Sequence, residues 1–530
     1  MKNSILFFCF LFGVICFAQD ITNTLPPGGK FIVKDATNNY LTLDQSTGQM
    51  NILKTLRLEN TTSSTIGVIF KGVDRFMHNY GSNNTFMGIN SGNFTMTGGN
   101  NTGVGRQSLY SNTTGLFNTA IGCGSLNSNT SGGSNTALGY GSLNFNSEGY
   151  NNVAVGYQSL RQNHGNGNTA VGTYALEDNV GNSYSTAIGY NAMAFAENSL
   201  TGRAVYNTAV GSDALRGDPE EATGIYNTAI GSYSMTMYTS GYSNTACGYH
   251  SLHSINTGYF NVAIGAFSLS TNGSGFENTG IGAYSCYNNE GNQNTAVGRY
   301  SLYLNESGSG NTAIGYSAGD WVATVNYGTF IGSGCYASAS SLTNVTGIGY
   351  NTRPTTSNQV RIGNSSVTSI GGYAGWTDFS DARYKTSVQE NVSGLDFILK
   401  LRPITYKLDV NKLAADLGED RRRDENGNIK MEALPEDIKA RNEKSQIVYT
   451  GFAAQEVEKI AKEIGFDFSD IDSPKNENDF YGLRYAEFVV PLVKAVQEQQ
   501  SQIQNQQSQI HNQEKIIAEL TKRIESLERK

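Results

Sequence analysis

Two residues at an abrupt change of composition are of the types that perform chemistry: Ser380 and Lys385, within the segment 380–385. A serine hydroxyl becomes a nucleophile when a nearby base takes its proton. A lysine acts as that base once burial or a neighbouring positive charge keeps it neutral. A long, repetitive, charge-poor region precedes the segment, and a charged region follows it. A serine and a lysine at such a junction predict that the chain cuts itself there.

The spacing of Ser380 and Lys385 does not by itself bring the two side chains together. Residues five apart share neither one face of a helix nor one face of a strand. We therefore expect either a turn that returns Lys385 to Ser380 or a lysine from a neighbouring subunit. Arg383 supplies positive charge that favours a neutral lysine, whereas Asp381 opposes it unless its side chain points away. The alternative interpretation makes Ser380 a helix cap and Lys385 a solvated charge.

The first residues of the chain predict export. Lys2 precedes an apolar run from Ile5 to Phe17, and Ala18 follows it. A basic start, a short apolar core and a small residue are typical of a secretory signal peptide, here residues 1–18 with cleavage after Ala18. The run is too short to cross a bilayer, and no later stretch reaches the roughly 18 apolar residues that a membrane helix needs. We expect a secreted protein, extracellular or at the cell surface, without a membrane span.

Composition narrows the class of protein further. The 530 residues carry a net charge of −8, which gives no electrostatic reason to expect a nucleic-acid partner. The 61 glycines do not recur at every third position, which excludes collagen, and the many aromatic and β-branched residues disfavour disorder. The five histidines show no spacing typical of a metal site. We expect neither a metal nor a cofactor.

A short repeat dominates residues 81–365. The phrase Asn-Thr-Ala-(Ile/Val)-Gly and its variants recur with a period of 17 residues, twice shortened to 16, and Ser or Ala followed by Leu or Met comes three residues after the closing glycine. Two short strand-like pieces per repeat cannot bury a core alone, but stacked copies can, as in a β-solenoid or β-roll. At about 4.8 Å per coil, the sixteen intervals from Gly88 to Gly363 predict a rod of roughly 77 Å.

The repeat region offers little material for catalysis. Between Ser91 and Leu200 the charged residues are Arg106, Glu148, Arg161, Glu177, Asp178 and Glu197. Glycoside hydrolysis needs two carboxylates that face one bond. An enzyme that degrades a polysaccharide is therefore disfavoured, and we interpret the rod as a structural element.

One line along the rod has the chemistry to bind a ligand. Several tyrosines directly follow the repeat glycine, and five of them are Tyr140, Tyr157, Tyr190, Tyr249 and Tyr316. A solenoid places such residues near one line, where their rings could stack on the sugars of a surface glycan. The favoured alternative is that the rings stack on one another as a ladder.

The cysteines of the rod follow the repeat pattern. Cys247 takes the Ile/Val position and Cys286 takes the Leu position, so both are expected to be small core residues. Cys123 and Cys335 lie in other phases of the repeat and in distant coils. A disulfide framework is therefore not expected.

The sequence changes character after residue 363. Charged residues become frequent, residues 395–401 predict a helix that Pro403 ends, and residues 404–408 and 447–449 predict strands. The segment 451–458 leads into another helix. The charged stretch 409–444, with consecutive arginines at 421–423, is expected to be an exposed insertion.

The last segment predicts a helix that assembles with copies of itself. Counting from Val489, the a positions of a heptad pattern are Val496, Ile503, Ile510, Ile517 and Ile524, and the d positions are Leu492, Gln499, Gln506, Gln513, Leu520 and Leu527. β-Branched residues at a and glutamines in the middle d layers predict a coiled coil over 489–530. The alternative is a single amphipathic helix packed on the domain.

These observations divide the chain into six segments. They are a signal peptide (1–18), a β-rich attachment or cap region (19–80), the rod (81–365), a linker to the cleavage site (366–379), an α+β domain (380–488) and the coiled coil (489–530).

The repeats resemble the head repeats of trimeric autotransporter adhesins, which carry similar Asn-Thr-Ala-Val-Gly and Ser-Leu phrases, and also the fibre regions of phage tail proteins. The resemblance covers roughly residues 81–365 and implies a trimeric left-handed β-roll. The repeat is longer here than is usual in those heads. Because of the rod, we expect the coiled coil to be a trimer rather than a dimer.

The C-terminal segment resembles a second family. SDARYK at 380–385, LRPITY at 401–406, GFAAQEV at 451–457 and the segment 485–500 occur in the order found in the intramolecular chaperone domain of endosialidase-type phage tail spikes, serine peptidase family seventy-four. The resemblance implies a domain that trimerises the chain, templates folding of the β-rich part and then cuts itself off. Carried over by motif, Ser380 is the nucleophile, Lys385 its general base, and Phe379–Ser380 the bond that is cut.

Together, these patterns predict a mainly β protein: an exported, tail-fibre-like or adhesin-like homotrimer with a cis-acting autoproteolytic domain and no multiple-turnover activity. Its expected partners are its own copies and a surface glycan or cell-surface receptor. The first alternative is a trimeric adhesin that keeps its C-terminal domain without cleavage, and the second is the polysaccharide-degrading enzyme.

Overall fold

The computed structural model describes residues 27–52, 55–195, 202–218, 222–424 and 426–529. The chain divides into two compact units, and the boundary in the sequence lies between Val68 and Ile69. The signal peptide expected at 1–18 lies outside the described residues. Within the described ranges, no helix has the length and apolar character that a membrane span requires.

The first unit contains a three-stranded antiparallel sheet in the order β1-β2-β3. Its strands are β1 (Lys30–Lys34), β2 (Asn39–Asp44) and β3 (Gln49–Ile52). Lys30 lies opposite Asp44, and their side chains form an ion pair of 2.6 Å. These strands agree with the β-rich character expected of residues 19–80.

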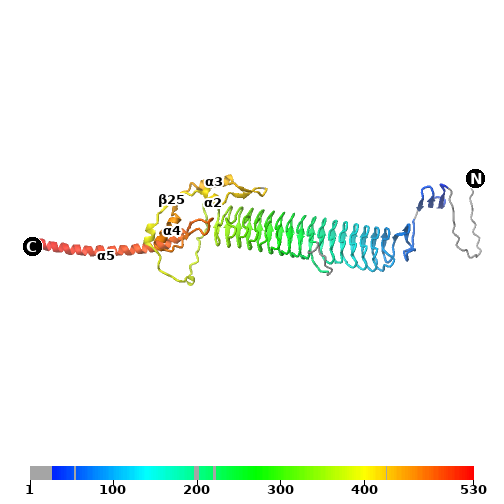
Figure 1. Cartoon of the computed structure of the whole chain (residues 1–530), viewed down its shortest axis with the longest axis horizontal. Coiled ribbons are helices and arrows are strands. Elements are labelled where there is room, and N and C mark those ends of the chain that lie inside the picture. The colour runs from blue at the N-terminus through cyan, green and yellow to red at the C-terminus, as the bar shows by residue number, and fades with distance from the viewer. Residues whose placement is uncertain (1–26, 53–54, 196–201, 219–221, 425, 530) are drawn as a thin grey trace, which may run out of the picture. The chain divides into compact units, whose positions relative to one another are not determined.

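The second unit begins with an antiparallel hairpin and continues as a β-solenoid (Figure 1). The hairpin strands are β4 (Ile69–Lys71) and β5 (Asp74–His78), and β5 pairs with the first coil. Each coil contributes one three-residue strand that pairs in parallel with the next, so that Thr119 lies opposite Thr136. These strands are β6 (Thr85–Met87), β7 (Thr102–Val104), β8 (Thr119–Ile121), β9 (Thr136–Leu138), β10 (Val153–Val155), β11 (Thr169–Val171), β12 (Thr186–Ile188), β13 (Thr208–Val210), β14 (Thr228–Ile230), β16 (Thr245–Cys247), β18 (Val262–Ile264), β19 (Thr279–Ile281), β20 (Thr295–Val297), β21 (Thr312–Ile314), β22 (Thr329–Ile331), β23 (Thr346–Ile348) and β24 (Val360–Ile362). Two neighbouring coils each contain an additional two-residue strand, and these strands pair in parallel: β15 (Met237–Tyr238), which follows β14, and β17 (Ser254–Ile255), which follows β16.

Two residues of each repeat form the core of the rod. The middle strand residue, such as Ala137, and the leucine four residues after the glycine, such as Leu143, have no solvent-exposed area. These two positions, alanine and leucine in most coils, stack into a continuous apolar column, which no single repeat could build. The expected β-solenoid is thus confirmed.

A buried column of asparagines fixes the register between coils. The side-chain carbonyl of Asn118 accepts a hydrogen bond from the backbone N–H of Asn135 at 3.0 Å, and the amide of Asn118 donates to the carbonyl oxygen of Gly132 at 2.8 Å. The same pattern recurs along the rod. A buried amide must satisfy its donor and its acceptor, so a coil that slipped by one residue would lose both bonds.

The third strand residue points out of the rod, which corrects the prediction for Cys247. We expected the Ile/Val position, and Cys247 in it, to lie in the core, but Cys247 is exposed, whereas Cys286 is buried as predicted. A strand alternates its faces, so the buried middle alanine turns both of its neighbours outward. The residues in this position form a line that we call the outer stripe: Met87, Val104, Ile121, Leu138, Val155, Val171, Ile188, Val210, Ile230, Cys247, Ile264, Ile281, Val297, Ile314, Ile331, Ile348 and Ile362.

The C-terminal domain is a small α+β fold. Its elements are η1 (Ala382–Tyr384), α1 (Leu395–Lys400), β25 (Ile404–Tyr406), α2 (Val410–Asp416), β26 (Arg421–Arg423), β27 (Ile429–Met431), α3 (Pro435–Lys444), β28 (Tyr449–Gly451), α4 (Ala454–Glu463), β29 (Ile471–Asp472), β30 (Gly482–Leu483) and η2 (Tyr485–Phe488). Antiparallel pairs join β25 to β28, β26 to β27 and β29 to β30. Phe397 of α1, Val457 of α4 and Phe488 form the centre of its core.

The chain ends in the 40-residue helix α5 (Val489–Glu528) (Figure 1). Its first turns pack on the domain, and the Glu498 carboxylate accepts a hydrogen bond from the backbone N–H of Leu395 at 2.7 Å. From residue 499 to 529 every side chain is exposed. Beyond its first turns, the apolar seam of α5 contacts no other described residue of the chain. The alternative of a single amphipathic helix packed on the domain is therefore wrong.

Candidate functional site

The structure brings Ser380 and Lys385 together. The Lys385 ammonium donates a hydrogen bond to the Ser380 hydroxyl oxygen at 2.9 Å. The 3-10 turn η1 lies between the two residues and folds the chain back, which is the first of the two arrangements that the spacing allowed. Contact between the two groups therefore needs no second subunit. Their roles as nucleophile and base stay a prediction.

Asp381, and not Ser380, caps the turn. Its carboxylate accepts a hydrogen bond from the backbone N–H of Arg383 at 2.9 Å and pairs with the Arg383 guanidinium at 2.6 Å. These hydrogen bonds lower the pKa of Asp381. Arg383 is thus turned toward Asp381, so the two charges neutralise each other beside Lys385.

In the single chain the site is open to solvent. Both Ser380 and Lys385 are exposed, and three apolar residues around them, Trp376, Phe379 and Tyr384, are 69–85% exposed. The Phe379 ring contacts the Tyr384 ring, with 5.4 Å between centroids. A lysine becomes a neutral base by burial or by nearby positive charge. The single chain provides no burial here, whereas the exposed aromatic residues are suited to be covered.

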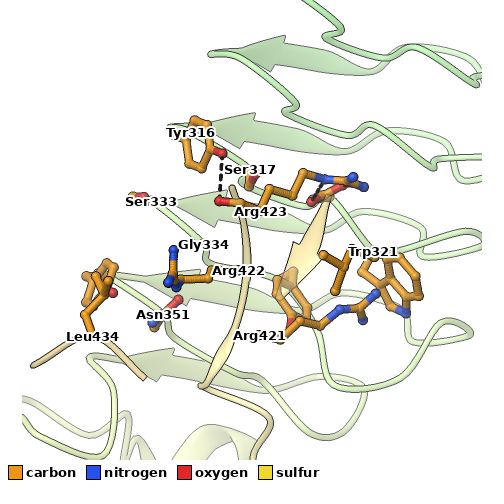
Figure 2. Close-up of a pocket in the computed structure, with 14 residues that line it drawn as sticks. Tyr316, Ser317, Trp321, Ser333, Gly334, Asn351, Arg421, Arg422, Arg423 and Leu434 are labelled. Carbon is orange, nitrogen blue, oxygen red and sulfur yellow. Dashed lines mark hydrogen bonds and ion pairs between the residues drawn. The ribbon is translucent and has the colours of Figure 1, made fainter. Parts of the chain in front are cut away.

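A second set of functional side chains lies where residues 409–444 contact the last coils of the rod, and it corrects the expectation of an exposed insertion. The side chain of Arg423 is only 7% exposed because it pairs with Asp320 of the rod at 2.6 Å. The Tyr316 hydroxyl donates to the carbonyl oxygen of Arg423 at 3.2 Å (Figure 2). A cavity of about 190 Å³ remains between β26 and the rod, beside Trp321. We call residues 409–444 the docking arm.

Sequence reasoning missed this contact because no local pattern reports it. Its partners are single residues, Asp320 and Trp321 on the rod and Arg421 and Arg423 on the arm, about 100 residues apart in the chain. The sequence did contain a signal of this contact. Asp320 and Trp321 are adjacent charged and aromatic residues in a charge-poor rod, and residues 421–423 are three consecutive arginines.

The five tyrosines predicted to form a line contact aromatic neighbours. Tyr140 stacks on Tyr157 with ring centroids 5.3 Å apart, and Tyr174 lies between Tyr157 and Tyr190. The other two, Tyr249 and Tyr316, belong to a second row. Its further members lie two residues after the repeat glycine and were not singled out in the sequence analysis: Tyr233, His250, Phe267, Tyr284 and Tyr300. In both rows the rings cover part of each other's faces, as in a ladder, and glycan binding by the five tyrosines stays a prediction.

The described ranges contain no cluster of three or more His, Cys, Asp or Glu side chains placed to share an ion.

A parallel β-solenoid followed by a small α+β domain and a long helix defines a fibre-like protein. Residues 380–466 match the family described as the chaperone of endosialidase, as the motifs at 380–385, 401–406 and 451–457 predicted, so the C-terminal domain of this fibre-like protein is similar to that family. The matched segment begins at Ser380 and includes Lys385 and the docking arm. No curated protein matches the chain.

Proposed function

We propose that this protein is an exported, homotrimeric surface fibre whose C-terminal domain trimerises the chain, templates folding of the rod, and then cuts the bond between Phe379 and Ser380. The observation that carries the proposal is the 2.9 Å hydrogen bond from Lys385 to Ser380, at the start of the segment that matches the chaperone family. Secretion is part of the proposal and rests on the sequence of residues 1–18.

The outer stripe supports a homotrimer. Its residues recur once per coil, and most are 36–45% exposed, for example Leu138, Ile230 and Ile348. Neighbouring coils lie about 4.8 Å apart, so the side chains join into one apolar surface as long as the rod. Soluble proteins rarely leave so long an apolar surface in water. Two further copies in the same register would cover it coil by coil.

The helix α5 supports the same assembly from the other end. Its a positions Ile503, Ile510, Ile517 and Ile524 are 40–61% exposed and lie on a helix that contacts nothing else there. An isolated helix with an apolar seam gains most of its stability by packing that seam. We propose a parallel coiled coil, which places three chaperone domains side by side at the end of the rod.

The proposed cleavage uses groups already in contact. Lys385, once neutral, takes the Ser380 hydroxyl proton, and the hydroxyl oxygen attacks the carbonyl carbon of Phe379. The C–N bond then breaks, the Ser380 nitrogen takes the proton back from Lys385, and an ester joins Phe379 to the Ser380 oxygen. Water then hydrolyses this ester: its oxygen joins the Phe379 carbonyl carbon, one of its protons restores the Ser380 hydroxyl, and the other goes to Lys385 or to solvent, so that a carboxylate remains on Phe379. Each step conserves atoms and charge, and no cofactor is needed.

Assembly is the proposed trigger for cleavage. A solvated lysine is protonated at neutral pH and cannot accept the serine proton. Packing of Trp376 and Tyr384 against a second copy would exclude water from Lys385 and favour its neutral form. Cleavage would then follow correct assembly and would mark a completed rod.

Intact mass and denaturing gels of the purified protein test the proposal, beside Ser380→Ala and Lys385→Ala. We expect a fragment that begins at Ser380 in the unaltered chain and none in either variant. Lys400→Ala is the matched control, since this lysine is also exposed and pairs only with Asp396 at 3.0 Å. An unaltered chain that stays whole as a trimer would leave a non-cleaving adhesin with a permanent C-terminal domain.

A further inference from the structure

The C-terminal domain is connected to the rod twice. One connection is the peptide chain through the linker 366–379, whose residues Tyr373 and Trp376 are largely exposed. The other is a set of non-covalent contacts between the last coils, upstream of Phe379, and the docking arm, downstream of Ser380. Cleavage between Phe379 and Ser380 breaks only the first connection.

An ion pair forms the centre of the second connection. The Arg423 guanidinium makes two hydrogen bonds to the Asp320 carboxylate, at 2.6 and 2.8 Å, and both side chains are at most 10% exposed. Burial raises the pKa of Asp320, and the hydrogen bond from Arg423 opposes that rise. A buried, doubly hydrogen-bonded pair is costly to break from one side, because the remaining charge loses its partner without regaining water.

Aromatic contacts flank the pair. The Arg421 guanidinium lies over the ring of Trp321 (Figure 2). Arg423 also lies over the ring of Tyr303, 4.4 Å from its centroid. Arginine on a desolvated aromatic face adds attraction. The strand β26 therefore presents Arg421 and Arg423 on one face, two residues apart, to successive coils of the rod.

A second group of contacts secures the last coil. The Glu419 carboxylate accepts a hydrogen bond from the backbone N–H of Ser365 at 2.8 Å and another from its hydroxyl. The Lys444 ammonium donates to the carbonyl oxygens of Ser365 at 2.7 Å and Val367 at 2.6 Å. Every one of these bonds joins a residue before the cleavage site to a residue after it.

We propose that the docking arm keeps the chaperone domain bound to the rod after the chain has been cut, so that cleavage nicks the protein without separating its two parts. This proposal depends on the proposed cleavage in one respect: self-cleavage is the event that would cut the chain in the natural protein. The bound domain leaves the outer stripe open, because Ile314, Ile331 and Ile348 are 39–43% exposed beside it, as Ile188 and Ile230 are in the middle of the rod. Retention is therefore compatible with the trimer, and three arms acting together strengthen it.

The test separates retention from self-cleavage. In a chain that carries Ser380→Ala and Lys385→Ala, the exposed segment 371–375 is replaced by the recognition sequence of a site-specific protease. After complete cutting, size-exclusion chromatography at a series of times after dilution measures the association of the two parts and their dissociation rate. We expect the rod and the C-terminal part to elute together. Two fragments that separate on cutting would overturn the proposal, whatever the unaltered chain does at Phe379.

A pair of variants tests whether the docking arm holds the two parts together after cutting. We expect Arg423→Ala to raise the dissociation rate of the cut complex about 30-fold or more, as for other truncated buried charge pairs. Arg402→Ala, which removes an exposed ion pair with Glu456 inside the domain, should leave the rate unchanged. Circular dichroism of the uncut chains verifies that both variants fold. Equal dissociation rates for the two variants would contradict the role assigned to Arg423.

Discussion

At the level of single residues, the repeat glycine is a position where the rod has no room for a side chain. Gly156 has a φ of +136°, and a Cβ added to it would lie 2.4 Å from the carbonyl oxygen of Gly172 in the next coil. Gly141 has a φ of +62°, and its added Cβ would meet only the side chain of Gln158, at 3.4 Å. The first glycine is therefore required by the coil stacking and the second only by its turn.

We expect Gly156→Ala to lower the free energy of unfolding of the rod by about 2–4 kcal/mol, because it combines backbone strain with a clash between coils. Gly141→Ala should cost about 1–2 kcal/mol, the usual strain of a left-handed alanine. Urea unfolding followed by circular dichroism compares the two. Equal losses would mean that the contact between coils adds nothing to the strain.

Asp470 makes the stability of the C-terminal domain depend on pH. Its side chain is 1% exposed and lies near Glu487, and burial, followed by the Glu487 carboxylate, raises the pKa of Asp470 to about 7. A carboxyl whose pKa is raised by folding stabilises the fold fully below its unfolded pKa and loses that contribution as the pH rises through the folded value. The domain should therefore be less stable at pH 8 than at pH 5.5.

The helical circular dichroism of the full chain in urea measures this effect. The unfolding midpoint of the C-terminal domain should fall between pH 5.5 and pH 8, and Asp470→Asn should remove most of that fall because the amide carries no titrating proton. Asp467→Asn, at an acidic residue nearby in the sequence, is the control. A slope that Asp470→Asn leaves intact would assign the dependence to another group.

Among the elements, those built by a local repeat could be predicted and those joined by distant contacts could not. The period of 17 residues determines which residues stack, so the solenoid and its leucine column follow from the sequence, and the heptad pattern predicts the helix α5. The outward direction of Ile230 and Cys247 did not follow from the sequence, because an Ile/Val position next to alanine is equally typical of a core position. The arm did not either, because its order comes from Asp320 and Trp321.

The candidate site divides in the same way. A turn between Ser380 and Lys385 was one of two possibilities that the spacing left open, and the cap at Asp381 decides how the turn closes. The exposure of the pair could not be foreseen, since it depends on what packs against residues 376–388. The residue types predict the chemistry, which stays a prediction, whereas the surroundings of the pair depend on contacts that no local pattern reports.

In the whole molecule, assembly and cleavage should therefore be inseparable. Ile510 lies in α5, 125 residues beyond Lys385 in the chain (510 − 385), and is 54% exposed in the single chain. Ile510→Asp would place a charge in the seam of the proposed coiled coil, at a cost of about 2 kcal/mol or more per subunit. Ser508→Asp adds the same charge on the outer face of the helix, two residues away, and is the matched control.

Analytical ultracentrifugation measures the oligomeric state of each variant, and the gel assay measures the rate of cleavage. We expect Ile510→Asp to shift the protein toward monomer and to slow the appearance of the fragment beginning at Ser380 by about tenfold or more, in line with a loss of about 1.4 kcal/mol or more in assembly. Ser508→Asp should remain trimeric and be cut at the normal rate. A monomeric Ile510→Asp chain that is still cut normally would show that Lys385 can act without burial by a second copy, and cleavage could then no longer report a completed rod.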